Sequence, residues 1–102
     1  MSLVSFVSAQ PEELTAAAGE LTGIGAALAA QNAAAEAVTT GVVPAAADPV
    51  SALTAAQFVA HAGLYQAVSA QANAIHQMFV TTLTASAASY EATEVANAIA
   101  AR

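Results

Sequence analysis

Histidines and carboxylates are the side chains of this sequence that could carry metal or acid–base chemistry. His61 and His76 are fifteen residues apart, roughly 22 Å along one helix, so within one chain they cannot share a metal. The carboxylates form no acid–base pair at any useful spacing. They are Glu12, Glu13, Glu20, Glu36, Asp48, Glu91 and Glu94. There is no G-x-S-x-G turn, phosphate-binding glycine loop or cysteine. The sequence therefore predicts no enzyme activity, no cofactor and no metal.

One cluster of polar residues near the C-terminal end differs from these scattered side chains. Tyr90, Glu91 and Glu94 stand in "SYEATEVANAIAAR", which has no other charge before Arg102. On a helix Tyr90 and Glu94 share a face, because they are four residues apart. Carboxylates near a helix C-terminus oppose the helix dipole, a small cost with no evident structural return. Three interpretations stay open from the residues alone: a helix end, a disordered tail, or an address read by another protein.

Charge excludes two classes of partner. The chain has 102 residues, a net charge of −6 and one basic residue, Arg102. Nucleic acids and anionic membrane surfaces both require lysine and arginine, so neither is expected as a ligand. No run of large apolar residues reaches the length of a membrane span. The N-terminal segment lacks the positive region of a secretory signal peptide, so any export is expected to use another route.

The elements that position these residues are predicted to be helices, because nearly a third of the chain is alanine. Pro11 suits a first helical position, with Glu12 beside the positive end of the dipole. Gly41 is expected to take the left-handed conformation after the helix. Asp48 is expected to cap a second helix, and Pro44 is a competing start. The predicted segments are a helix at about 11–38, a turn at about 39–48, a helix at about 49–84 and a tail at about 85–102.

Large apolar residues form more stripes than two helices can cover. The first helix carries Leu14, Leu21, Ile24 and Leu28. The second carries one stripe of Leu53, Leu64, Val68, Ile75 and Met78, and another of Phe58, Tyr65, Phe79 and Leu83. A hairpin partner is expected to cover one stripe of the second helix, which leaves the other exposed. The prediction is an all-α, antiparallel two-helix hairpin that completes a four-helix bundle with itself or with another chain. The predicted partner interface comprises Leu14, Leu21, Ile24, Leu28, Phe58, Leu64, Tyr65, Val68, Ile75, Phe79 and Leu83.

At this level of detail the sequence resembles the PE proteins of mycobacteria. The family is named for a Pro-Glu pair near the N-terminus, which corresponds here to Pro11 and Glu12. The likeness continues through "LTGIGAALAAQNAAA", "TTGVVPAAADPVSALTAAQFVAHAGLYQAVSAQA" and "SYEATEVANA". The likeness covers essentially the whole chain, which resembles a PE domain without a glycine-rich extension. Related sequences often carry an acidic residue where this one has Pro49, which affects only where the second helix begins.

The resemblance implies a non-enzymatic subunit that forms a 1:1 heterodimer with a PPE protein. An EspG-type chaperone would bind the tip of the PPE partner in the cytosol. The pair would then leave the cell through a type VII (ESX) secretion system, with the fifth system the most similar, and would be secreted or remain at the cell surface. The Tyr-x-x-x-Asp/Glu export signal corresponds to Tyr90 and Glu94, and the secretion ATPase is its expected reader. The alternative is a cell-envelope helical bundle, as a homo-oligomer or with PPE, that aids solute transport or host interaction.

Overall fold

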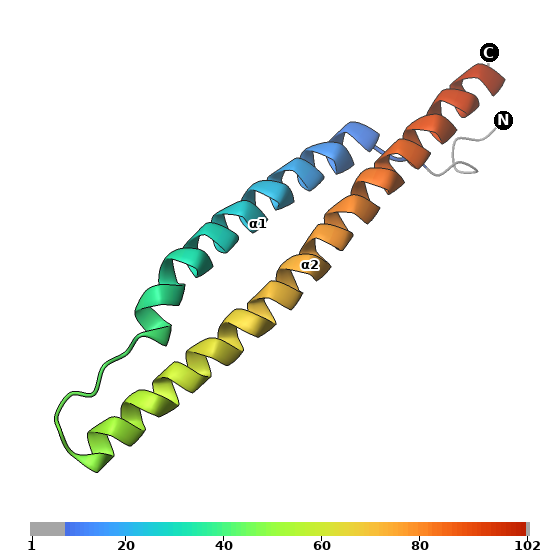
Figure 1. The fold of residues 1–102 in the computed structure, drawn as a ribbon. Helices are drawn as coiled ribbons and strands as arrows, with labels where there is room; N and C mark the ends of the chain where they lie inside the picture. The colour runs from blue at the N-terminus through green and yellow to red at the C-terminus, as the bar shows by residue number, and fades with distance from the viewer. Residues whose placement is uncertain (1–7, 102) are drawn as a thin grey trace. The chain divides into compact units, whose positions relative to one another are not determined.

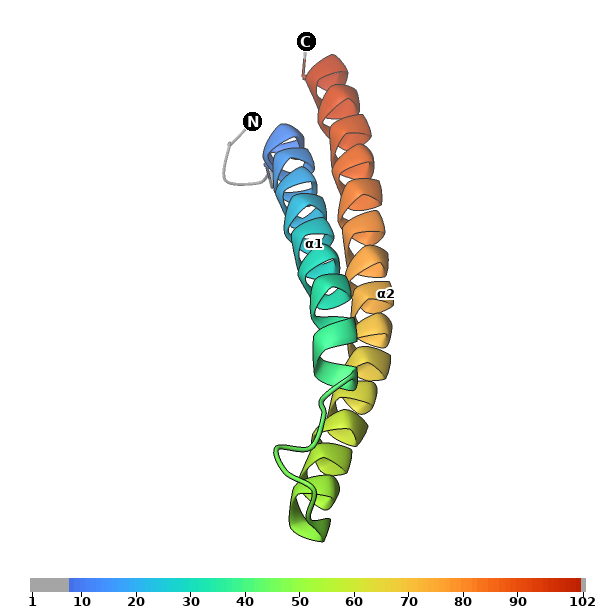
Figure 2. The same cartoon turned by 60° about the vertical axis from the view of Figure 1, so that its left-hand side comes forward.

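The computed structural model describes residues 8–101, and in this range the chain forms two α-helices. Helix α1 spans Pro11–Thr40 and helix α2 spans Pro49–Ala100 (Figure 1). The chain divides into two compact units, one made of Ile24–His76 and the other of the stretches before and after it. In each unit a stretch of α1 lies antiparallel to a stretch of α2, and the rotated view in Figure 2 agrees. The predicted all-α, antiparallel pairing is confirmed.

The start of α1 is the one that the sequence predicts. The backbone carbonyl of Gln10 accepts the N–H groups of Glu13 at 3.0 Å and of Leu14 at 3.2 Å. Pro11 occupies the first helical position, where its missing N–H would have no partner in any case. Glu12 and Glu13 lie in the first turn, at the positive end of the helix dipole.

Asp48 begins α2 as an N-cap. Its Oδ1 accepts the backbone N–H of Ser51 at 2.8 Å, and its Oδ2 accepts the Ser51 hydroxyl at 2.9 Å. Its carbonyl accepts the Ala52 N–H at 3.1 Å. These bonds satisfy amides that have no partner within the helix. Pro49 is therefore the first helical residue, and the competing start at Pro44 is not used.

Gly41 follows α1 but does not take the predicted conformation. No glycine among residues 8–101 has a positive φ, so the expectation of a left-handed residue at this position is wrong. The need for glycine is steric instead. A Cβ at residue 41 would lie 2.8 Å from the carbonyl oxygen of Ala37, closer than side chains approach backbone oxygens. The chain can leave the helix here because Gly41 has no side chain.

Helix α2 does not end near Thr84, where the sequence analysis placed the start of a tail. It continues to Ala100, and the Ala101 N–H still donates to the Asn97 carbonyl at 2.9 Å. The physical reason is the high helix propensity of this segment. The chain after Gly63 has no glycine or proline, and its alanines and glutamates are good helix formers. Threonine does not break the helix, because the Thr93 hydroxyl donates to the carbonyl four residues earlier.

Mostly small and polar side chains lie between the helices in the unit Ile24–His76, whereas Leu14, Leu21 and Leu83 are half-buried in the other unit. The buried apolar residues of the described range are four alanines, Ala18, Ala55, Ala62 and Ala87. In the unit Ile24–His76, the less exposed positions of α2 from Ala55 onward recur at alternating intervals of four and three. They are Ala55, Val59, Ala62, Gln66, Ser69, Asn73 and His76, and we call them the seam. This spacing is the one at which a helix keeps a single line of side chains against a neighbour.

The seam overturns one prediction about packing. Helix α1 was expected to cover one of the two large apolar stripes of α2, but it covers neither. Apart from the half-buried Leu83, every member of both stripes is at least 48% exposed. Alanine and other small residues allow the helix axes to approach closely, and bulky side chains must then point elsewhere. The hairpin therefore has little apolar core of its own.

Candidate protein-interaction site

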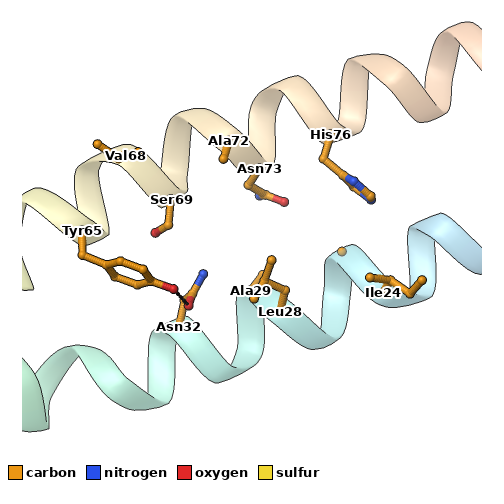
Figure 3. A pocket seen from close by; sticks show the side chains of 11 residues that line it. Ile24, Leu28, Ala29, Asn32, Tyr65, Val68, Ser69, Ala72, Asn73 and His76 are labelled. Atoms are coloured by element: carbon orange, nitrogen blue, oxygen red, sulfur yellow. Dashed lines mark hydrogen bonds between the residues drawn. The ribbon is translucent and has the colours of Figure 1, made fainter.

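A groove runs between the two helices within the unit Ile24–His76. It has a volume of about 420 Å³, and its apolar walls include Ile24 and Leu28 from α1 and Tyr65 and Val68 from α2. Figure 3 shows these side chains on the two facing helices. Each of the four is between 48% and 62% exposed, so their apolar surface is available to another molecule.

A second groove of about 360 Å³ extends the apolar surface in the same unit. Val38, Val42, Phe58 and Tyr65 line it, and Tyr65 belongs to both grooves. We call the exposed large residues of the two grooves the apolar face. Its members are Ile24, Leu28, Val38, Val42, Phe58, Tyr65 and Val68.

The other flank of α2 in this unit is different, because small residues occupy it. Ala56, Gly63 and Ala70 follow the seam on that side. The unit Ile24–His76 therefore presents one large-residue flank and one small-residue flank to a neighbour. A partner that buries apolar area gains much more from the apolar face.

Asn32 joins the two helices beneath the apolar face. Its Oδ1 accepts the Tyr65 hydroxyl at 2.7 Å, and its backbone carbonyl accepts the Gln66 Nε2–H at 3.0 Å. Figure 3 shows the Tyr65 and Asn32 side chains pointing toward each other from opposite helices. These two bonds fix which turn of α1 lies opposite Tyr65 and Gln66 of α2. Asn32 therefore sets the register of the two helices in this unit. The Tyr65 bond also orients the ring that both grooves share.

At the other end of the first groove, the His76 side chain points from α2 toward α1 (Figure 3), where its ring lies close to Gly25. A Cβ at residue 25 would lie 2.7 Å from His76 Cδ2 and from His76 Nε2. Glycine is therefore what allows the imidazole to approach α1. His61 is exposed and lines the second groove. Neither histidine joins two further His, Cys, Asp or Glu side chains in a possible metal site within residues 8–101.

The remaining residues of the predicted partner interface lie in three kinds of place. Ile75 is 66% exposed and Phe79 is 56% exposed, and the spacing of Phe79 from Tyr65 is that of one helix flank. Leu64 lies between the buried Ala62 and the half-buried Gln66, so it points away from α1. Leu14, Leu21 and Leu83 are half-buried in the other unit.

Tyr90 and Glu94 both lie on α2, within the unit that contains the start of α1. Tyr90 is 48% exposed and borders a shallow hollow formed with Thr81, Thr82 and Ser86. Glu94 is half-buried, and its Oε1 accepts the backbone N–H of Ala9 at 3.2 Å.

This contact gives a structural role to a carboxylate near the end of α2, for which the sequence alone indicated none. Ala9 precedes α1, so the carboxylate of Glu94 lies near the positive end of the α1 dipole. The two residues are 85 positions apart in the sequence. No local pattern could have indicated that they meet.

Comparison with known proteins identifies a family for this chain. A model of the PE family matches residues 7–97. The chain belongs to the PE family. It is 67% identical to PE family protein PE13 of Mycobacterium tuberculosis strain H37Rv, over 96% of this chain and 99% of that protein. The resemblance noted in the sequence is thereby confirmed, and Pro11 and Glu12 lie in the first turn of α1.

Longer members of the PE family from the same organism share the region as well. The chain is 59% identical to PE8 over 96% of its own length, but it spans only 36% of PE8. It is 54% identical to PE_PGRS8 over 93% of its length and spans 54% of that protein. None of the helical segments that the structure describes is sufficiently long and apolar to cross a membrane.

Proposed function

We propose that this PE protein is a non-enzymatic subunit that pairs 1:1 with a PPE protein and is exported with it by a type VII secretion system. The apolar face is the observation that carries the pairing. Phe58 and Ile24 are each 60% exposed, whereas the buried apolar residues of the described range are only alanines. The free energy available from covering this face is much larger than the hairpin can obtain internally.

The geometry of the face favours a helical partner. Two antiparallel helices on one side of the hairpin would cover both grooves and produce a four-helix bundle. An exposed apolar surface beyond a few hundred Å² is unusual for a monomer and common at protein interfaces. Interfaces of obligate complexes reach roughly 2,000 Å² or more. Ile75 extends the proposed PPE-binding surface along α2 in the same unit, because its spacing continues that of Val68. Phe79, which is exposed in the other unit, is a further proposed contact.

The proposed export signal is Tyr90 with Glu94. Tyr90 is nearly half exposed on α2, so a receptor such as the secretion ATPase can reach its ring. In this proposal an EspG-type chaperone binds the PPE partner in the cytosol, and the complex is then secreted or held at the cell surface.

The decisive experiment is co-expression with the PPE protein encoded nearest to this gene, followed by affinity purification and light scattering. We expect a soluble 1:1 complex, and a 1:1:1 complex once the EspG-type chaperone is added. A soluble homo-oligomer that ignores the PPE chain would overturn the proposal. It would assign the apolar face to self-assembly, in agreement with the alternative of a cell-envelope bundle.

A further inference from the structure

The bond between Glu94 and Ala9 concerns a residue of the proposed export signal. A receptor that reads a Tyr-x-x-x-Glu motif directly would need the glutamate free. Here the Glu94 side chain is half-buried and already accepts the Ala9 N–H at 3.2 Å. Tyr90, one helical turn earlier on the same face, is 48% exposed. Within the motif, Glu94 is therefore half-buried and already hydrogen-bonded, whereas Tyr90 is exposed to a receptor.

The partner of Glu94 lies where it affects the start of α1. Ala9 is itself half-buried and precedes Gln10, whose carbonyl accepts the first backbone bonds of the helix. The Glu94 carboxylate therefore contacts the backbone just before α1, near the positive end of the helix dipole. Charge-assisted bonds of this kind are stronger than neutral ones. Glu94 thus connects the entry of α1 to the last turns of α2.

We propose that Glu94 is a positioning residue, which holds residues 8–10, directly ahead of α1, against the face of α2 that displays Tyr90. The secretion machinery then binds the Tyr90 ring together with this segment, and it does not read the charge of Glu94 directly. The inference rests on the proposed export function, which it deepens by assigning different roles to the two residues.

The variants that test this proposal separate charge from hydrogen bonding. Glu94→Gln keeps an oxygen that can accept the Ala9 N–H but removes the charge. Glu94→Ala removes both, and Ala9→Pro removes the donor while leaving Glu94 intact. Glu91→Ala is the matched control, because Glu91 is exposed on the same helix and its loss changes the net charge equally.

The first measurement is amide hydrogen exchange at Ala9 in the full chain, in complex with PPE or in whichever assembly it purifies. Glu94→Ala should accelerate this exchange roughly tenfold or more, whereas Glu94→Gln should stay within a few-fold of the wild type. Glu91→Ala should leave it unchanged. Equal exchange at Ala9 in the wild type and in Glu94→Ala would overturn the inference.

The second measurement is secretion of the same variants from mycobacterial cells, with complex formation checked by co-purification. Glu94→Ala and Ala9→Pro should both lose export, and Glu94→Gln should restore most of it. If Glu94→Gln is as defective as Glu94→Ala, the charge is read directly and the inference is wrong, although the export function stands. If Tyr90→Ala is exported normally, the proposed export function itself fails, and Ala9 exchange still decides the role of Glu94.

Discussion

Phe58 offers the sharpest test of the apolar face. Its side chain is 60% exposed and lines the second groove of the unit Ile24–His76. Phe58→Ala should therefore weaken pairing with PPE while leaving the hairpin intact. The hairpin loses little packing, because most of the ring contacts no other residue of the chain. Helix α2 is not weakened either, since alanine is the better helix former.

The size of the effect follows from the exposed area. A phenylalanine side chain buries roughly 200 Å² when fully covered, so an exposed fraction of 60% corresponds to about 120 Å² available to a partner. At ~25 cal/mol per Å² this amounts to about 3 kcal/mol if the partner covers it completely. Alanine retains part of that area, so the expected loss is about 2 to 3 kcal/mol, or roughly 30- to 150-fold in Kd.

Leu53→Ala is the matched control. Leu53 is 63% exposed in the same unit, but it lies between the half-buried Ser51 and the buried Ala55 and so points away from α1. Titration calorimetry or competition for tagged PPE should show less than about a threefold change for this variant. Equal losses in Phe58→Ala and Leu53→Ala would refute the assignment of the partner to one face. No loss in Phe58→Ala would remove the apolar face from the interface altogether.

Three further predictions concern the register, the start of α2 and the export signal. Asn32→Ala and Tyr65→Phe should each lower the unfolding free energy of the complex by about 1 kcal/mol in urea titrations, and the double variant should cost no more than either alone. The hydrogen bonds from the Ser51 amide and hydroxyl lower the pKa of Asp48 below its ordinary value of 3.8. Its stabilising contribution is therefore present above that value and is lost as pH falls through the lowered pKa, and Asp48→Asn should remove this part of the pH dependence of Tm. Tyr90→Ala should abolish secretion with unchanged co-purification of PPE, and unchanged secretion would contradict the role given to Tyr90.

Local features of this protein could be predicted from the sequence because local chemistry decides them. Asp48 begins α2 through bonds to residues three and four positions away, and Pro11 begins α1 directly after Gln10, whose carbonyl accepts N–H groups three and four positions on. Alanine content made both helices predictable, and the absence of useful spacing among histidines and carboxylates led to the expectation of no catalytic site. The end of α2 was misjudged: the segment after Thr84 was expected to be a tail, whereas it continues the helix, with the hydroxyls of Thr84 and Thr93 donating to the carbonyls four residues earlier.

The family resemblance supplied the expectation of a PPE partner and of an export signal at Tyr90 and Glu94. Neither could have come from periodicity. Periodicity instead indicated that the chain has more apolar stripes than one two-helix hairpin can bury. That excess remains in the structure, where α1 covers neither of the two apolar stripes of α2.

By itself the sequence determined the two helices, their direction and an apolar surplus that calls for a partner. Only the tertiary structure decided which residues form the seam and which form the apolar face. The physical reason is that the alanines of the seam, together with Gly25 of α1, allow close approach of the helices, and this excludes Phe58 and Tyr65 from the position that their size would suggest. The structure also decided the pairing of Glu94 with Ala9, because a contact across 85 positions depends on how the two ends of the chain meet.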